Sequence, residues 1–549
     1  MTKRRLTIGR LLEAGMLALS LATSAEAQTI THWVTPDGSP ASACVQADPC
    51  TLTRAFALAS NGTIDDDAVV LVRNTSAPQR SFYSQAGLTL GGGGSVGHPI
   101  TFVFEHGAVI TGSRLCPSPE SWSLVPGLQR TYQMAHDQVG AFNSSNPAQR
   151  NPSNWQPITV ANNATTDKRV DLDRPVRYRN ANSIKEVEAQ GGSHYDTATT
   201  IYVQTFDGQA PSDAHDLCLS STGWGTVTIQ GDYYVFVNLQ MQHSQKSGAN
   251  GLEIANSSDG VVFRGCDLWG TGITGRGKGT LFDDCRAGGV ILQGPSTGSQ
   301  CYNPHAWAVG LCFNAQASGS AVDLGIQGSS ASYGQVWRRS RVYNSWNGMS
   351  LMGPNTVEDS LLDGFPNHTF SASGNGGIVR RNVMCNGQDS MYLEGNNFDN
   401  LTVENNLACN GVLFWVSRDG KGGIAPTKWT LARNIMPTLV YDDKTFRSVK
   451  ADCNVFIRPP ADPGTDLLRI AGTDGVTPES YNTLAHWRAA KPAQDVSSVE
   501  LPAAHWTNGA QFRQFTNNST WFDFHPVDGA QALQLATCEA FAGPYGIGR

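Results

Sequence analysis

The sequence predicts an all-β fold, a parallel β-solenoid, on three observations. The 549-residue chain contains 58 glycines and only 15% charged residues, and without a collagen-like period this composition favours many short strands and turns. Segments of roughly 20 to 25 residues repeat along the chain, a length typical of solenoid repeats. A polar column recurs at one position of successive repeats, as Ser340, Ser360, Asn382, Asn406, Asn434 and Asn454.

The first segment, residues 1–27, has the layout of a cleavable secretory signal. Three basic residues precede an apolar run, and Ala25-Glu26-Ala27 closes it, so we expect cleavage after Ala27 and an exported protein. No later apolar run is long enough to span a bilayer. The formal net charge is -7, and the signal carries more basic than acidic residues, so the mature chain is more acidic still. An acidic chain argues against general nucleic-acid binding.

The remaining chain divides into four predicted parts. Residues 28–116 read as a strand, a capping helix near Leu52 to Ser60 and the first coils. A β-rich insertion follows at 117–225, then the main solenoid at 226–460 and a C-terminal tail region at 461–549. The helix would cover the open edge of the first coil, which would otherwise invite aggregation.

The repeat alignment accounts for many charged residues without invoking function. Residues of one column stack about 4.8 Å apart in successive coils. Arg338, Glu358, Arg380 and Glu404 alternate in sign along one column, and Arg339, Asp359 and Arg381 do so along the next. Opposite charges on neighbouring strands stabilise a sheet by about 0.2 to 1 kcal/mol per pair. An Asn in the same turn of each coil can bond to its neighbours and tolerates left-handed geometry.

The twelve cysteines of an exported chain favour disulfides over metal ligands. Cys266 and Cys285 align in adjacent coils, as do Cys385 and Cys409, so both pairs are expected to be bonded. Cys44 with Cys50 and Cys301 with Cys312 are expected loop closures. The connectivity of Cys116, Cys218, Cys453 and Cys538 stays open.

Several stretches carry a family resemblance. They are PCTLTRAFALAS and GHPITFVFEHGAVITGS near the N-terminus, SHYDTATTIYVQTFDG from Ser193, and ESYNTLAHW and FDFHPVDGAQA near the C-terminus. Together they resemble secreted right-handed parallel β-helix proteins of the pectate-lyase-like superfamily. His194 and His525 stand where an aromatic residue and an arginine are usual. The resemblance implies a right-handed parallel β-helix and a polysaccharide substrate, and members are often monomers. The sequence lacks the paired-Asp motif of polygalacturonases, the motifs of pectin methylesterases and the DPHD motif of alginate epimerases, which argues against these three activities. Fold alone does not assign chemistry.

One outward face of the solenoid is the predicted site, because period-2 geometry sends alternate residues outward. The alignment places Gly348, His368 and Ser390 in one outward column, Ser350, Phe370 and Tyr392 in the next, and Met352, Ala372, Glu394 and Arg418 in a third. Asp419 and Lys421 follow in an adjacent loop. Glu253 and Asp323 are expected on the same sheet in earlier coils, whereas the register of Arg276 and Lys278 stays open.

Three functions fit this face. The first is β-elimination on a uronate polymer, with Arg418 and Lys421 neutralising the sugar carboxylate, His368 or Lys421 as base and Tyr392 as acid. The second is hydrolysis by two carboxylates about 5 to 10 Å apart, with Glu394 and one of Asp323, Asp389 or Asp419. The third is glycan binding without catalysis, by exposed aromatic residues such as Phe370, Trp415 or Tyr392.

The residue types favour an enzyme over a binder, and a lyase slightly over a hydrolase. An imidazole, a phenol, a carboxylate and two cations converge on one face. Asp389 aligns with Asn347 and Asn367 and so also fits a turn role. The sequence leaves a calcium requirement, the sugar and the linkage open.

Overall fold

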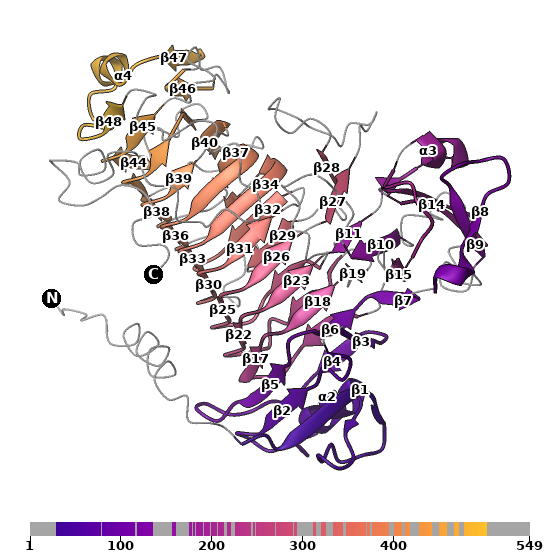
Figure 1. The fold of residues 1–549 in the computed structure, drawn as a ribbon. Coiled ribbons are helices and arrows are strands. Elements are labelled where there is room, and N and C mark those ends of the chain that lie inside the picture. The colour runs from indigo at the N-terminus through magenta and orange to yellow at the C-terminus, as the bar shows by residue number, and fades with distance from the viewer. Residues whose placement is uncertain are drawn as a thin grey trace, which may run out of the picture.

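The computed structural model describes residues 29–501, with internal gaps of which the longest are 136–155, 161–174, 294–310 and 418–427. Strands stack in successive coils from the N-terminal helix to the C-terminal helix (Figure 1). Each coil contributes one strand to each of three parallel ladders, here named the first, second and third faces. The fold is therefore the predicted right-handed parallel β-helix. No helix in the described part of the chain is long and apolar enough to cross a membrane.

The first face is a 12-stranded sheet in which neighbouring strands are parallel. Its strands are β1 (His32–Ser39), β2 (Val69–Val72), β5 (Ile100–Phe104), β17 (Tyr234–Val237), β22 (Val262–Arg264), β25 (Leu281–Asp283), β30 (Val336–Arg338), β33 (Thr356–Glu358), β36 (Ile378–Arg380), β38 (Thr402–Glu404), β41 (Trp429–Ala432) and β44 (Val449–Asp452).

The second face follows the first within each coil, across a short turn. Its strands are β3 (Ser81–Ser84), β6 (Ala108–Thr111), β18 (Gln240–Gln242), β23 (Asp267–Trp269), β26 (Arg286–Gly288), β31 (Arg341–Tyr343), β34 (Leu361–His368), β37 (Val383–Glu394), β39 (Leu407–Ala408), β42 (Ile435–Met436), β45 (Val455–Ile457) and β48 (Val499–Leu501).

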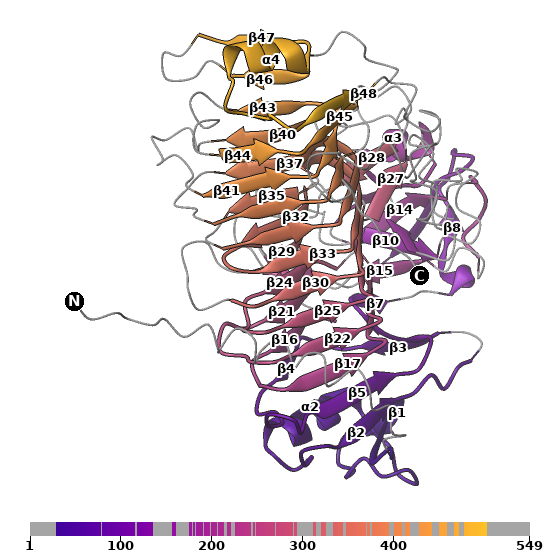
Figure 2. The same ribbon diagram turned by 90° about the vertical axis from the view of Figure 1, so that its left-hand side faces the viewer.

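The third face carries the predicted site. Its strands are β4 (Leu88–Leu90), β16 (Val227–Ile229), β21 (Leu252–Ile254), β24 (Ile273–Gly275), β29 (Ser320–Leu324), β32 (Asn347–Met352), β35 (Phe370–Ser373), the end of β37, β40 (Val412–Ser417), β43 (Leu439–Tyr441), β46 (Leu468–Ile470) and the antiparallel β47 (Glu479–Tyr481). Figure 2 shows the coils stacked one above another.

The core lies between the three faces and consists of stacked apolar side chains. Phe102, Phe236, Phe263, Phe282 and Trp337 follow one another on the inner side of the first face, with successive ring centroids 5.7, 5.1, 4.8 and 5.4 Å apart. All five side chains are fully buried. Burial of such rings is a large share of the apolar area that holds the coils together.

Helix α2 (Leu52–Ser60) lies at the N-terminal end of this core (Figure 1). The hydroxyl of Thr51 accepts a hydrogen bond from the Arg54 backbone N–H and so caps the first turn. Phe56 packs edge-on against Phe102, with centroids 5.1 Å apart. At the other end, helix α4 (Leu484–Ala490) buries Leu484 and Trp487.

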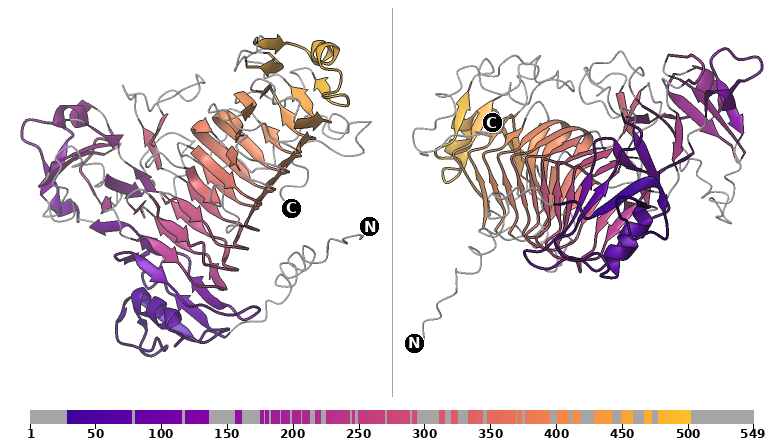
Figure 3. Two further views of the ribbon diagram at one scale, coloured as in Figure 1. Left: turned by 180° about the vertical axis from the view of Figure 1, so that it is seen from behind. Right: turned by 60° about the horizontal axis from the view of Figure 1, so that its bottom comes forward.

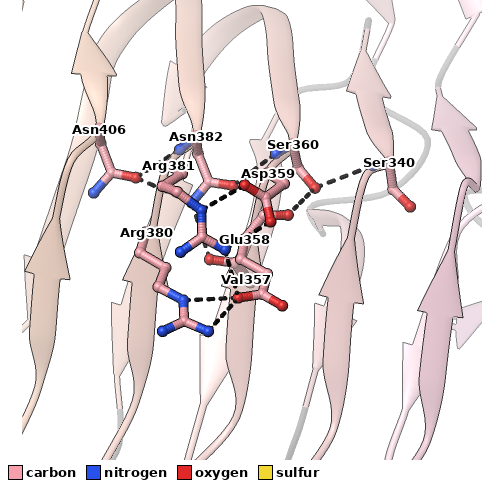
Figure 4. Close-up of polar contacts among 9 residues, drawn as sticks. All are labelled: Ser340, Val357, Glu358, Asp359, Ser360, Arg380, Arg381, Asn382 and Asn406. Atoms are coloured by element: carbon pink, nitrogen blue, oxygen red, sulfur yellow. Dashed lines mark hydrogen bonds and ion pairs between the residues drawn. The ribbon is translucent and has the colours of Figure 1, made fainter. Parts of the chain in front are cut away.

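The turn between the first and second faces carries the polar column. In successive coils the backbone N–H of Asn382, Asn406 and Asn434 donates to the side-chain oxygen of the next Asn, at 3.0 to 3.1 Å. Ser340 and Ser360 extend the same ladder toward the N-terminus (Figure 4). Every member from Ser340 to Asn454 is at most 1% exposed, so the ladder is confirmed as buried structure rather than as a site.

The left-handed residue of this turn is not the Asn itself but the residue before it. Arg339, Asp359, Arg381, Asn405 and Arg433 have φ between 49° and 58°. The ladder residue thereby points its side chain along the solenoid axis, where it can satisfy the next coil. Non-glycine residues accept the strain of this conformation only where their surroundings fix it.

The alternating charges form ion pairs, as predicted. Arg380 lies 2.6 Å from Glu358 and Arg381 2.6 Å from Asp359 (Figure 4). In an earlier coil, Arg338 and Arg339 both contact Asp283. Burial alone would raise the pKa of Asp283, but hydrogen bonds from the two guanidinium groups outweigh it and lower that pKa.

Two predicted disulfides are confirmed, Cys44–Cys50 and Cys266–Cys285. Cys453 is also disulfide-bonded. The Cys385–Cys409 and Cys301–Cys312 pairs stay predictions, because Cys409 and Cys301 lie outside the described residues.

Within the described ranges, insertions with strands of their own interrupt the corner between the second and third faces in three coils. The largest, between β6 and β16, is called the insertion module and contains helix α3 (Ile184–Ala189) and two sheets. The four-stranded sheet contains β7 (Ser113–Leu115), β10 (Gln156–Val160), β11 (Pro175–Arg177) and β15 (Cys218–Ser220). The five-stranded sheet contains β8 (Ser123–Leu124), β9 (Tyr132–Ala135), β12 (Arg179–Asn180), β13 (Ser193–Asp196) and β14 (Thr200–Gln204). The module stands beside the solenoid in both views of Figure 3.

Two hairpins leave the same corner in later coils. The first is β19 (Gln245–Lys246) with β20 (Ala249–Asn250), and the second is β27 (Val290–Gln293) with β28 (Leu311–Asn314). Strand β11 of the insertion module contacts β27, so the module and the second hairpin form one continuous projection.

Candidate active site

The strand register of the third face defines one column of residues, here named the outer column. It alternates with a fully buried column of apolar residues, Leu252, Ile273, Met349, Phe370 and Met391, each at most 1% exposed. The members of the outer column, in successive coils, are Thr228, Glu253, Thr274, Asp323, Ser350, Ser371, Tyr392 and Trp415. Two of them, Thr274 and Ser350, are themselves only 8% and 6% exposed.

Glu253 and Asp323 occupy the outer column two coils apart. Thr274 lies between them as the register partner of both. Two steps of about 4.8 Å separate the two backbones by about 10 Å. The Glu253 carboxylate is 20% exposed and lies 3.7 Å from the Arg276 guanidinium, which is 47% exposed. The register thus places the acidic residues Glu253 and Asp323 in one column, and Arg276 forms an ion pair with the first of them.

Tyr392 and Glu394 occupy β37 further along the same face. Tyr392 pairs with Ser371 in the preceding coil and with Trp415 in the following one. Glu394 pairs with Ser417 and lies two residues beyond Tyr392, at a position of the same parity. Two aromatic residues are therefore neighbours in the outer column.

His368 lies where β34 reaches the corner between the second and third faces, and its register partner is Asp389. The predicted column of Gly348, His368 and Ser390 is therefore wrong by one residue. The structure instead places an imidazole residue and a carboxylate residue in adjacent coils, about 4.8 Å apart along the axis.

Phe370 is a second correction, because it is fully buried rather than exposed. It pairs with Met349, and Ser371 takes the position expected for it beside Ser350. A one-residue slip exchanges the inner and outer sides of a strand. The register shift between Phe365 and His368 is where the slip arises. Phe370 belongs to the core and is withdrawn as a substrate-binding residue.

The remaining predicted residues follow strand β40 in the sequence. Arg418, Asp419 and Lys421 lie outside the described residues, and the register partner of Glu394 is Ser417 rather than Arg418. Across the described ranges, no group of three or more His, Cys, Asp or Glu side chains is arranged to hold a metal ion.

The pairing of Glu253 with Asp323 is a combination that the sequence reasoning missed. It paired Asp323 with Glu394, which lies three coils further on and outside the outer column. The signal was present in GLEI and AVDL, two segments with an acidic residue between apolar ones. The structure also fixes Arg276, whose backbone N–H donates to the Ile254 carbonyl beside Glu253.

No protein-family model and no curated protein matches the sequence. Among solved structures, a glycoside hydrolase has a TM-score of 0.44 at 10% identity, covering 86% of this chain and 96% of that one. XylC in complex with xylose has a TM-score of 0.39 at 12% identity, covering 74% and 75%. A rhamnogalacturonan lyase has a TM-score of 0.36 at 10% identity, covering 87% and 91%.

Proposed function

We propose that this chain is an exported enzyme that cleaves glycosidic bonds of a polysaccharide along the third face of the β-helix. The carrying observation is the position of Glu253 and Asp323 in one column, two coils apart. The stacked coils offer an extended surface, which suits an extended polymer better than a compact ligand.

Hydrolysis is the chemistry that this pair supports. An inverting glycosidase needs two carboxyl groups about 6.5 to 9.5 Å apart, with a water between one of them and the sugar. Side chains on backbones about 10 Å apart can reach that separation. We assign Glu253 as the base, because its carboxylate already forms an ion pair with Arg276. It takes a proton from the attacking water while Asp323 protonates the leaving oxygen.

The outer column beyond Asp323 would hold the rest of the polymer. Tyr392 and Trp415 occupy adjacent coils there, and aromatic rings suit the apolar C–H faces of sugars. Glu394 and the loop residues Asp419 and Arg418 are assigned to the polar groups of the same sugars.

A second candidate is β-elimination on a uronate polymer, favoured by the pairing of His368 with Asp389. A carboxylate beside an imidazole can orient it as a base, as in other acid–base pairs. In this reading His368 takes the proton next to the sugar carboxylate, Tyr392 protonates the leaving oxygen, and Lys421 and Arg418 neutralise the carboxylate.

One experiment separates the two chemistries. The mature protein is incubated with neutral polysaccharides and with polygalacturonate, while reducing ends and absorbance near 235 nm are recorded together. Hydrolysis gives reducing ends without absorbance, and Glu253→Gln and Asp323→Asn then each lower the rate at least a hundredfold. The matched control Thr228→Ala, in the same column, changes it less than threefold.

Elimination gives absorbance together with reducing ends. His368→Ala and Tyr392→Phe then each lower the rate at least tenfold, and Glu253→Gln does not. Binding of a polymer without either signal means a glycan-binding protein and refutes both reactions.

A further inference from the structure

A row of four side chains crosses the five-stranded sheet of the insertion module. Tyr195 on β13 pairs with Tyr202 on β14, Tyr202 pairs with Gln133 on β9, and Gln133 pairs with Ser123 on β8. Three interstrand steps make the row about 14 Å long. This row, named the tyrosine row, contains two phenols, an amide and a hydroxyl, and no charged group.

The tyrosine row lies on the side of the sheet that faces away from the module's core. Ile201 and Val203, the neighbours of Tyr202 along the strand, are fully buried among Trp122, Met134 and Leu217. Both tyrosines are partly exposed. Since alternate residues of a strand face opposite sides, the tyrosine rings are not part of that core.

Helix α3 covers the next row of the same side and stops short of the tyrosines. The Ser193 hydroxyl donates to the Val187 carbonyl, and the Thr131 hydroxyl donates to the Glu188 carboxylate at 2.7 Å. Ser193 pairs with Gln204, and both are buried. The helix therefore lies alongside the tyrosine row, over the neighbouring row of the same side of the sheet.

The two rings are close to parallel. Their centroids lie 6.2 Å apart and their planes differ by 27°. Buried aromatic pairs often meet edge to face, whereas these two rings present similar orientations. A pyranose ring has an apolar C–H face that packs on an aromatic plane, and its hydroxyls can bond to an amide such as that of Gln133.

The position of the module links this row to the candidate active site. The module contacts β27 through β11. The hairpin of β27 and β28 leads into β29, the strand that carries Asp323. Strand β11 belongs to the four-stranded sheet of the module, so the five-stranded sheet with the tyrosine row is joined to the candidate face only through that sheet.

From these observations we propose that the tyrosine row is a second binding site, outside the catalytic face, for an uncharged stretch of a glycan chain. The absence of charge within the row matches neutral sugar rings, and its length exceeds a single ring. The site raises the local concentration of polymer and leaves the cleavage of short oligosaccharides unchanged.

The test is affinity electrophoresis of the full mature chain in native gels containing arabinoxylan, galactan, galactomannan or polygalacturonate. At least one neutral polymer is expected to retard the protein. Tyr195→Ala with Tyr202→Ala weakens that retardation at least tenfold, whereas Tyr202→Phe, which keeps the ring, changes it less than twofold. The matched control is Tyr333→Ala, which removes an exposed tyrosine of the solenoid. Circular dichroism confirms that all variants are folded.

The proposal is overturned if no neutral polymer retards the protein, if only polygalacturonate does, or if the double alanine variant binds like the parent chain. Cleavage is measured separately on oligosaccharides and on polymer. If the protein cleaves neither substrate but its retardation still depends on the two tyrosines, the proposed enzymatic function is contradicted and this binding site is supported.

Discussion

At the scale of single residues, the buried ladder shows how one side chain can serve several backbone groups. The Asn406 side-chain oxygen accepts from both the backbone and the side-chain amide of Asn382, and its amide donates to the Val379 carbonyl and to Asn434. An unsatisfied buried polar group costs about 1 to 3 kcal/mol. The sequence predicted this column correctly, because its spacing follows the repeat.

Replacing Asn406 with alanine is expected to lower the free energy of unfolding by about 2 to 4 kcal/mol, since it removes the acceptor of the Asn382 N–H and the side-chain donor to the Val379 carbonyl. Asn406→Ser is the matched control and should cost less, because Ser360 performs the same role for the Ser340 N–H. Denaturant titration measures both. Equal losses in the two variants would contradict the proposed role of the side-chain oxygen.

A second residue-scale feature is the buried carboxyl group of Asp495. Burial raises its pKa to about 6, the negative charge of Asp452 adds to the rise, and hydrogen bonds from Ser498, Asn454 and Trp487 oppose it. The folded state therefore holds a proton more tightly than the unfolded state, whose carboxyl titrates near 3.9.

We expect Asp495 to make the protein more stable as the pH falls from 7 through about 6 toward 4. The gain is on the order of 2 to 3 kcal/mol, from a shift of about two pH units at about 1.4 kcal/mol each. Asp283, whose pKa is lowered, acts in the opposite direction at still lower pH. Unfolding is measured at pH 7 and pH 5 in the parent chain and in Asp495→Asn. A variant with the same pH dependence as the parent would refute this assignment.

At the scale of strands, register decides which residues the site contains. The column alignment of the first face was correct, because its turns have constant length. It failed by one residue at β35, where β34 runs through the corner with an irregular register. No periodicity within a strand reveals how many residues a corner consumes, so Phe370 was placed outside instead of inside.

This register makes a direct prediction at the element scale. Phe370→Ala should lower the free energy of unfolding by about 3 to 5 kcal/mol, as expected for a buried phenylalanine. Ser371→Ala, its neighbour in the outer column, should change it by less than about 1 kcal/mol. Thermal and denaturant unfolding measure both changes. An unchanged free energy of unfolding in Phe370→Ala would contradict the buried position of Phe370 and favour the exposed one.

At the scale of the whole molecule, the solenoid was predictable and the candidate site was so only in part. The repeat and the polar column predicted the stacked coils, and Glu253 and Asp323 were expected on one sheet, where the register has them. Thr274 and Asp323 are neighbours in the column, one coil apart, although 48 residues lie between them in the sequence. Part of that distance is the insertion between β26 and β29, which contains the hairpin of β27 and β28. The local patterns GLEI and AVDL placed both residues on one sheet, but a local pattern does not give the number of coils between them.

The direction of the ladder also limits how such a molecule can change its length. Each ladder side chain accepts a hydrogen bond from the backbone N–H of the ladder residue one coil earlier. For the last Asn, Asn454, the acceptor is the Ser498 hydroxyl, which in turn donates to Asp495. If one entire coil were added or removed, each ladder residue could still donate its backbone N–H to the side chain of the next coil. A cut within a coil would instead leave a buried N–H without an acceptor at the break. This solenoid can therefore gain or lose only whole coils without leaving a ladder hydrogen bond unmade, and Ser498 and Asp495 end the ladder.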